Sequence, residues 1–152
     1  DTPHCPLPCD SLENLDWLKD ECATVIGPPL WGQEQFVPLA GAAADCAFFV
    51  LPAPAPADST DPDFEARYRT ISNGVTPRAY ATLAYDGAQL LLTAIAAEIA
   101  SRGQPSREGV AHALAQSAYA GLSGRISFDA ERNWAQATPW VYRWYRGELV
   151  PP

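Results

Sequence analysis

Basic residues are scarce in this sequence. Its 152 residues include only ten Lys and Arg against eighteen Asp and Glu, which gives a net charge of −8 at pH 7. A surface of that sign repels nucleic-acid phosphates and anionic lipid headgroups, so the composition argues against nucleic-acid binding and membrane-surface binding. The sequence also lacks an apolar run long enough to cross a bilayer, and we expect no membrane insertion.

We also expect no signal peptide within these residues. The sequence starts at Asp1, and we expect it to be a processed product or an excised piece of a longer protein. Hydrophobic residues make up 47% and charged residues 18%, a composition that excludes disorder and provides a hydrophobic core.

Cysteines are few, and their number is even. Cys5 and Cys9 lie in a Pro-rich segment, whereas Cys22 and Cys46 flank predicted regular elements. This pattern is compatible with two disulfides in an oxidising compartment, and of three possible pairings we favour Cys5–Cys9 with Cys22–Cys46. A zinc site built from His4 and the first three cysteines lacks the second ligand pair of a zinc knuckle. We therefore expect no metal and no cofactor.

Catalytic signatures are missing too. Gly121–Gly124 approaches a nucleophile elbow, but its second glycine comes one residue early, and we expect Ser123 to be a loop serine after a helix. His4 and His112 have no partner at a recognisable spacing, and no Gly-rich phosphate loop is present. The sequence predicts a protein that is not an enzyme, and a secreted hydrolase is the least favoured alternative.

Two short apolar segments are predicted to be strands, at residues 23–27 and 47–51. The second shows no alternation, which is typical of a strand covered on both faces in a parallel sheet. A helical turn is expected between them, at residues 40–45. The connector at residues 52–62 alternates Pro and Ala, and we expect it to be stiff, with no side chains suited to a core.

The longest predicted element is a helix that runs from Thr76-Pro77 to Gly103. Shorter helices are expected after Cys9, after Asp61-Pro62 and after Ser106. The buried stripe that we predict on the long helix consists of Tyr80, Leu83, Ala84, Leu91, Ala94 and Ile95.

The C-terminal segment alternates like a strand. Trp140, Tyr142 and Trp144 are expected on one face, followed by a hairpin turn at Arg146-Gly147. An aromatic row, with Trp134 nearby, could stack on sugar rings, but we favour the interpretation that it packs in the core. The order of elements predicts a mixed α/β class.

The end of the first strand is the best candidate binding loop on geometric grounds. In open α/β sheets, ligands gather outside the carboxyl ends of the strands. Gly27-Pro28-Pro29 ends the strand, and we expect the Trp31 side chain that follows to point into open space.

The order of several motifs resembles the later part of type I periplasmic solute-binding proteins, the group that includes leucine/isoleucine/valine-binding proteins. The resemblance covers about Leu15 to Val150. The segments that carry it are Val25–Pro28, Leu39–Pro52, Asp61–Phe64, Ala66–Tyr68, Tyr80–Ala88, Gly121–Asp129, Val141–Tyr142 and Gly147–Glu148.

This resemblance implies a partial type I periplasmic-binding-protein-like α/β fold, with parallel strands flanked by helices and a C-terminal β-hairpin. The implied parts are a Cys/Pro-rich segment (1–14), a portion of the second lobe (15–51), a hinge linker (52–62), a helical portion of the first lobe (63–138) and the hairpin (139–152).

The resemblance also implies a bacterial receptor, periplasmic or extracellular, that binds a small organic ligand for ABC transport or sensing. The implied ligand-binding residues are Pro29, Leu30, Trp31 and Tyr80. In the family, an acidic residue often stands where Pro29 or Leu30 lies here and receives the ligand ammonium. An aromatic or apolar acid is therefore expected beside amino acids as a ligand.

The family's first half is missing from the chain. Expected partners are the missing N-terminal half of a receptor or a second copy in a swapped dimer, together with an ABC permease or a sensor. The alternative function is a ligand-free interaction or dimerisation module derived from such a receptor, and an aromatic carbohydrate binder ranks third.

Overall fold

The computed structural model describes residues 26–44 and 47–151, which fall into two compact units. Unit 1 joins the part of the chain up to Leu51 to the segment from Pro139 onward, and unit 2 is Pro52–Thr138. The predicted helix after Cys9, His4 and all four cysteines with their predicted disulfides lie outside the described residues. The assignment of residue ranges to two lobes and a hinge stays a prediction.

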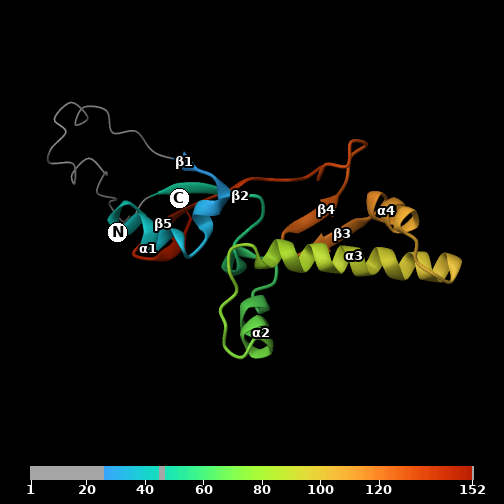
Figure 1. Ribbon diagram of the computed structural model, residues 1–152, viewed down its shortest axis with the longest axis horizontal. Coiled ribbons are helices and arrows are strands. Elements are labelled where there is room, and N and C mark those ends of the chain that lie inside the picture. Colours follow the sequence, from blue (N-terminus) through green and yellow to red (C-terminus); the bar gives the residue numbers. More distant parts are fainter. Residues whose placement is uncertain (1–25, 45–46, 152) are drawn as a thin grey trace. The chain divides into compact units, whose positions relative to one another are not determined.

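Unit 1 is built on a mixed four-stranded sheet (Figure 1). Its strands lie in the order β1 (Ile26–Gly27), β2 (Phe48–Leu51), β5 (Trp140–Tyr145) and β6 (Glu148–Val150). β1 and β2 are parallel, whereas β2–β5 and β5–β6 are antiparallel. Parallel pairing and a C-terminal hairpin were both expected, and the mixed α/β class is confirmed.

The core of unit 1 is aromatic. Phe49 on β2 stands opposite Tyr142 on β5, with ring centroids 6.4 Å apart, and it also contacts Trp144 at 6.1 Å. Tyr142 and Trp144 are buried, so the aromatic row packs mainly in the core, as favoured above. Phe48 and Val50 lie on the other face and are only half-buried. The expectation that β2 is covered on both faces is therefore wrong, because an apolar run does not reveal how closely each face is covered.

Three short helical segments follow β1. They are η3 (Pro29–Gly32), α1 (Phe36–Ala40) and η4 (Gly41–Ala44), the last of which is the expected helical turn. A Cβ atom on the buried Gly32 would come within 2.8 Å of the Phe49 ring and 3.0 Å of Leu51. Only glycine allows η3 to lie this close to β2.

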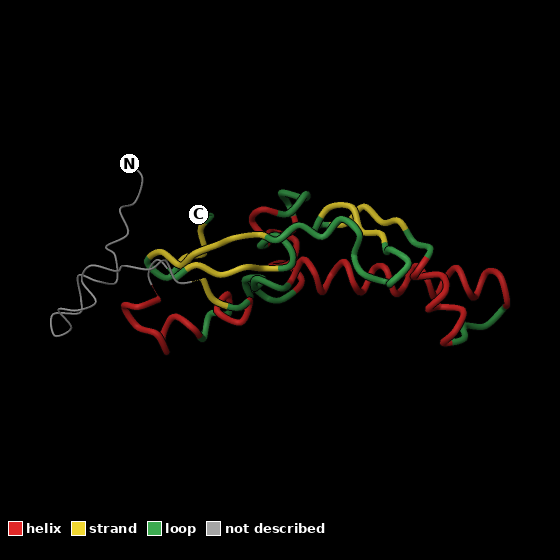
Figure 2. Tube along the Cα trace, turned by 90° about the horizontal axis from the view of Figure 1, so that it is seen from above, coloured by secondary structure: helices red, strands yellow, loops and turns green. Residues whose placement is uncertain are grey.

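Unit 2 is mainly helical, with one small hairpin. Its elements are η5 (Pro56–Asp58), α2 (Phe64–Ile71), α3 (Ala81–Arg102), α4 (Arg107–Ala115), β3 (Ala118–Gly121) and β4 (Gly124–Ser127). Three expected helices are present, and Gly103, with φ 79°, ends α3 as predicted. β3 was not expected, so Ser123 follows a strand rather than a helix. The hairpin lies along α3 in both views (Figure 1, Figure 2).

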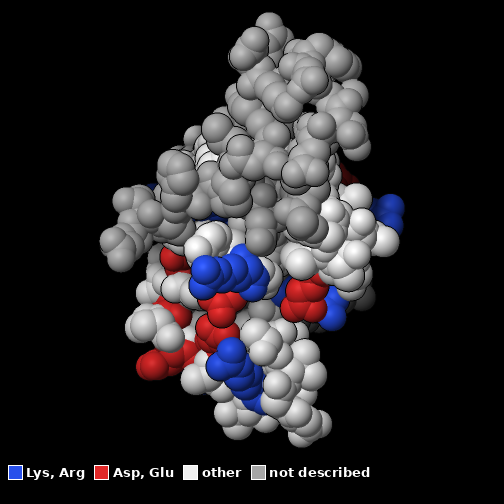
Figure 3. All heavy atoms as spheres, turned by 90° about the vertical axis from the view of Figure 1, so that its left-hand side faces the viewer, with Lys and Arg blue, Asp and Glu red and all other residues white. Residues whose placement is uncertain are grey.

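Charged side chains organise the start of α2. The Asp61 carboxylate accepts a hydrogen bond from the backbone N–H of Asp63 at 3.0 Å and pairs with Arg67. The hydrogen bond from Arg67 is the largest cause of a lowered Asp61 pKa. Within α2, Arg69 pairs with Glu65, which lies four residues earlier on the same face of the helix, at 2.6 Å. On the face drawn in Figure 3, basic side chains likewise lie directly beside acidic ones.

The buried face of α3 is not the predicted stripe. Its buried residues are Thr82, Asp86, Leu90, Ala94 and Glu98. Of the predicted stripe only Ala94 is buried, whereas Ala84 and Leu91 are exposed. The prediction followed the most apolar face of the helix, and in this chain a more polar face packs against the rest of unit 2.

The polar groups on this buried face are hydrogen-bonded. The Thr82 hydroxyl donates to the carbonyl of Pro54 at 2.7 Å. The Asp86 carboxylate accepts the backbone N–H groups of Leu122 and Ser123, each at 2.8 Å. Because Leu122 and Ser123 form the β3–β4 turn, Asp86 attaches the hairpin to α3. These bonds offset the cost of burying polar side chains.

The Pro/Ala connector contributes to the core of unit 2. Ala53, Pro54 and Ala55 are buried, and Pro54 receives the hydrogen bond from Thr82. The expectation that this stretch has no side chains suited to a core is therefore wrong. Small side chains let the backbone pass close to the start of α3.

The contact between α3 and α4 depends on a glycine. The Glu98 carboxylate accepts a hydrogen bond from the Ser106 hydroxyl at 3.1 Å and pairs with Arg102 at 3.4 Å. A Cβ atom on Gly109 would overlap that carboxylate. Ser106 in turn caps α4 by accepting the N–H of Gly109 at 3.0 Å.

The expectation about long apolar segments needs a correction. With 22 residues, α3 is long and apolar enough to cross a membrane by length and composition alone. The α3 sequence was not recognised as a long apolar run because Asp86 and Glu98 interrupt its apolar residues. Both acids are buried and hydrogen-bonded within unit 2.

We predict that Asp86→Ala destabilises unit 2. The free energy of unfolding should fall by roughly 2–3 kcal/mol, because two backbone N–H groups lose a charged acceptor. Urea unfolding followed by circular dichroism measures this loss. Glu108→Ala, at an exposed position, is the control, and an equal effect of both substitutions would contradict the anchoring role of Asp86.

Candidate functional site

The candidate binding loop begins where β1 ends. Gly27 is the last residue of the strand, and Pro28 is extended, with φ −69° and ψ 165°. The chain then turns into η3, in which Trp31 N–H donates to the Pro28 carbonyl at 3.0 Å and Gln33 N–H to that of Leu30 at 3.1 Å. Proline at the first helical position favours this turn. The loop is thus a defined turn at the carboxyl end of a parallel strand.

Trp31 packs against its own loop. Its indole ring stacks on Phe36, with ring centroids 4.9 Å apart and an interplanar angle of 17°. The ring also covers Gly27 so closely that a Cβ atom there would overlap it. Trp31 is half-buried, and the expectation that its side chain points into open space is wrong.

A second tryptophan ties this loop to the sheet. The Trp144 indole N–H donates to the Trp31 carbonyl at 2.7 Å. Trp144 is buried beside Phe49, so the bond connects the candidate loop to the aromatic core of unit 1. A buried indole N–H needs an acceptor, and here the acceptor fixes the loop.

Pro28, Pro29 and Leu30 are the exposed residues of the loop. The Leu30 side chain is 70% exposed, and the segment 28–32 contains no charged side chain. The nearest acid, Glu34, has a partner within the chain. The loop therefore offers an apolar contact surface of fixed shape.

Tyr80 belongs to unit 2, where it precedes the first turn of α3. Its side chain is half-buried, and burial raises the pKa of its phenol. The phenol therefore stays protonated at neutral pH and can donate a hydrogen bond. The structure brings Pro29, Leu30 and Trp31 together in one turn, and it describes Tyr80 with the other unit.

Two residues weighed for catalysis, Ser123 and His112, belong to unit 2, whereas the loop belongs to unit 1. Ser123 is in the β3–β4 turn, where Asp86 binds its backbone N–H, and His112 is exposed on α4. Among the described residues, no group of three His, Cys, Asp or Glu side chains is placed to hold a metal ion.

Sequence reasoning missed two residues that shape the site. Phe36 stacks on the Trp31 ring, and the Trp144 indole N–H donates a hydrogen bond to the Trp31 carbonyl. Phe36 lies five residues beyond Trp31, a spacing that matches neither of the helical pairs i, i+3 and i, i+4, so the sequence did not indicate the stacking. Nothing in the sequence indicated the bond from Trp144, which is 113 residues away from Trp31.

We predict that Gly27→Ala displaces the Trp31 ring. The added methyl group has no room, and overpacking of this kind costs roughly 1–3 kcal/mol. Near-ultraviolet circular dichroism should report the loss of the stacked aromatic pair, and thermal unfolding the loss of stability. Gly87→Ala on α3, where a Cβ atom meets nothing within 4 Å, should be neutral or slightly stabilising. An unchanged aromatic spectrum in Gly27→Ala would refute the close packing.

Solved structures with the same fold include several solute receptors. The leucine binding protein LivK from Thermotoga maritima is 21% identical, with a TM-score of 0.69, over 84% of this chain and 35% of that chain. LivJ from Streptococcus pneumoniae, solved with isoleucine, is 25% identical, with a TM-score of 0.65, over 84% and 37%. A solute-binding protein of an R. palustris ABC transporter, solved with benzoate, is 21% identical, with a TM-score of 0.55, over 75% and 31%. The chain thus matches about a third of the length of each of these proteins.

A comparison with curated protein sequences gives no match. In contrast, the sequence profile described as periplasmic binding protein matches residues 18–148, which is most of the chain. The parallel β1–β2 pair, the long helix and the first strand of the C-terminal hairpin, β5, all lie within that range. The chain belongs to the periplasmic binding protein family, of which it carries a part of the fold.

Proposed function

We propose that this chain is part of a receptor that binds a small organic ligand, such as an amino acid or an aromatic or apolar acid, without catalysing a reaction. The observation that carries the proposal is the exposed Leu30 in a rigid turn at the end of a parallel strand, within a periplasmic binding protein. Ligands of open α/β folds bind at such strand ends.

The chemistry of the loop supports the ligand class. Residues 28–32 offer apolar surface and no carboxylate for a ligand ammonium group. The relatives with known structures are described with leucine, isoleucine and benzoate, all of which are carboxylates with an apolar portion. The apolar portion of such a ligand would lie against Leu30 and the Trp31 ring edge. Tyr80 is proposed as a ligand contact on the ground of the family resemblance, with its phenol as the hydrogen-bond donor.

Family membership supports a location and a partner for this receptor. We propose that the protein acts outside the cytoplasmic membrane of a bacterium, in the periplasm or at the cell surface. It would pass its ligand to an ABC permease or report it to a sensor.

We predict that Leu30→Ala weakens ligand binding. Burying a leucine side chain contributes about 1.5–3 kcal/mol, which corresponds to a loss in affinity of roughly tenfold to a hundredfold. Titration calorimetry with leucine, isoleucine and benzoate measures the affinity, and thermal unfolding measures the stability. Stability should not change, because Leu30 is exposed.

Leu39→Ala is the matched control for this experiment. Leu39 is 86% exposed and lies on α1 of the same unit, outside the segment 28–32. Its substitution should leave the affinity unchanged. The proposed role of the loop fails if the two substitutions weaken binding equally, and the proposed ligand class fails if none of the three compounds binds.

A second prediction concerns Tyr80→Phe. Loss of the phenol should weaken the binding of a carboxylate ligand by roughly tenfold, since a hydrogen bond to a charged group contributes about 1.5 kcal/mol or more. Because burial raises the Tyr80 pKa, the phenol stays protonated and can donate at every pH below about 10, the ordinary pKa of tyrosine. Binding to the unsubstituted chain should therefore be insensitive to phenol ionisation between about pH 6 and 9. Calorimetry across that range tests both statements, and an unchanged affinity in Tyr80→Phe would contradict the role.

A further inference from the structure

The Trp31 carbonyl lies in the last turn of a short helix. η3 ends at Gly32, and carbonyl groups in the last turn of a helix lack an N–H partner within that helix. The Gln33 N–H donates to the Leu30 carbonyl at 3.1 Å. The Trp31 carbonyl receives its hydrogen bond, at 2.7 Å, from the indole N–H of Trp144, which is 113 residues away in the sequence.

The sheet of unit 1 fixes the position of this donor. Trp144 lies on β5, between β2 and β6, where it stands opposite Leu149 and its backbone N–H donates to the Ala47 carbonyl at 3.4 Å. Its side chain is 5% exposed and contacts Phe49. A buried indole that is held in this way cannot follow the loop if the loop moves.

The hydrogen bond sets the orientation of the loop backbone. The Trp31 carbonyl belongs to the peptide group that leads into Gly32, and Gly32 is buried against Phe49. On the other side, the Trp31 N–H donates to the Pro28 carbonyl at 3.0 Å. Leu30 lies between these two fixed points, so the direction of its exposed side chain depends on both.

Loss of the indole N–H would leave the Trp31 carbonyl beside an aromatic ring without a donor. An unsatisfied carbonyl away from water is unfavourable, and the loop can relieve this only by turning the peptide group towards solvent. The stacking of Trp31 on Phe36 opposes that movement but supplies no donor. The turn would therefore shift, and Leu30 would shift with it.

We propose that Trp144 is a positioning residue for ligand binding, which acts through Leu30 and does not touch the ligand. Its indole N–H holds the turn after β1 in the form that presents Leu30, so the C-terminal hairpin β5–β6 takes part in the binding site. The inference rests on the proposed function, because it concerns affinity at the same loop.

Two variants remove the N–H group. Trp144→Phe is the simpler one. The second places β-(3-benzothienyl)alanine at position 144, which carries sulfur instead of the N–H and keeps the size of the indole if Trp144→Phe does not fold. Titration calorimetry with leucine, isoleucine and benzoate should show a loss of affinity of roughly threefold to tenfold. An unchanged affinity would overturn the proposal.

A double-mutant cycle shows whether Trp144 acts through Leu30. In the Leu30→Ala background, either change at position 144 should cause no further loss of affinity, because the side chain that Trp144 positions is gone. Losses that multiply would show that the two residues act independently and would overturn the proposal.

The ligand-free chain gives a spectroscopic readout of the same bond. The ¹³C resonance of the Trp31 carbonyl should move upfield in both Trp144 variants, because the carbonyl no longer accepts a hydrogen bond from the indole. The same resonance in both variants and in the unsubstituted chain would overturn the proposal.

Trp134 is the matched control. Its indole N–H also donates to a backbone carbonyl, that of Arg125 at 3.0 Å, but both residues belong to unit 2. Trp134→Phe should therefore leave the affinity and the Trp31 resonance unchanged. An equal loss of affinity in Trp134→Phe and Trp144→Phe would reflect a general loss of stability and would overturn the positioning role.

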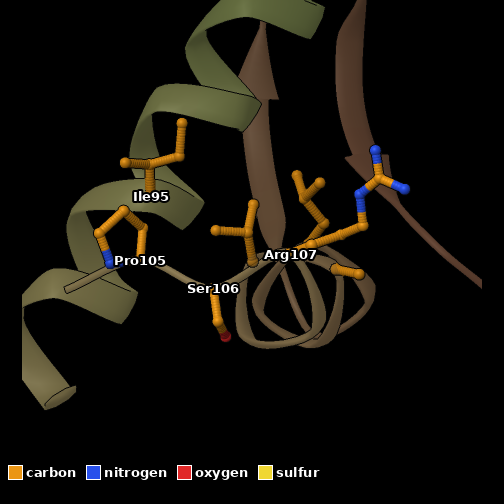
Figure 4. Close-up of a pocket in the computed structure, with 7 residues that line it drawn as sticks. Ile95, Pro105, Ser106 and Arg107 are labelled. Atoms are coloured by element: carbon orange, nitrogen blue, oxygen red, sulfur yellow. The ribbon is translucent and has the colours of Figure 1, made fainter.

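A second apolar surface has to be distinguished from the loop in these titrations. An open groove of about 430 Å³ lies between α3 and α4, lined by Ile95, Pro105 and residues of α4, and its Arg107 side chain extends away from Ile95 (Figure 4). Ala111 is exposed in its wall, so Ala111→Glu places a charge there. We expect no change in affinity from this substitution, and a loss would place the probes in the groove and overturn the proposal.

Failure of this proposal and failure of the proposed function give different results. If none of the three compounds binds to the unsubstituted chain, the proposed function fails and the positioning role fails with it. If they bind equally to the unsubstituted chain and to both Trp144 variants, only the positioning role fails.

Discussion

The two hydrogen bonds from the hairpin turn to the Asp86 carboxylate fix the orientation of α3 about its axis. Leu122 N–H and Ser123 N–H each lie 2.8 Å from a carboxylate oxygen, and Asp86 is fully buried. A charged group in that position cannot turn towards another partner without leaving two backbone donors unpaired. The face that carries Asp86 must therefore point to the hairpin, and the apolar face on the other side of the helix must point away from it.

Unit 1 shows a comparable dependence on close packing. Gly27 and Gly32 leave room for the Trp31 ring and for Phe49, so the turn after β1 can lie against the sheet. The Trp144 indole then holds the Trp31 carbonyl. Together these contacts give the candidate binding loop a fixed shape in the absence of ligand, which lowers the ordering cost of binding.

Local signals in the sequence were sufficient to locate most elements. Gly103 ends α3, and Arg146-Gly147 form the β5–β6 turn, because left-handed backbone conformations favour particular residues. The apolar pattern located α3 but not its buried face, since periodicity cannot tell which neighbours are present to cover it. β3 escaped notice because alanine and glycine dominate Ala118–Gly121. The position of the Trp31 ring depends on contacts between separate segments of the chain, and local sequence patterns do not predict such contacts.

The contact between Glu98 and Gly109 has a consequence for sequence divergence. The space beside the glycine is filled by a carboxylate that also holds Ser106, so the two positions are sterically coupled. A lineage that acquires a larger residue at 109 must shorten residue 98 at the same time, and it then loses the hydrogen bond that the Ser106 hydroxyl donates to Glu98. Among relatives of this chain, positions 98 and 109 are therefore expected to covary.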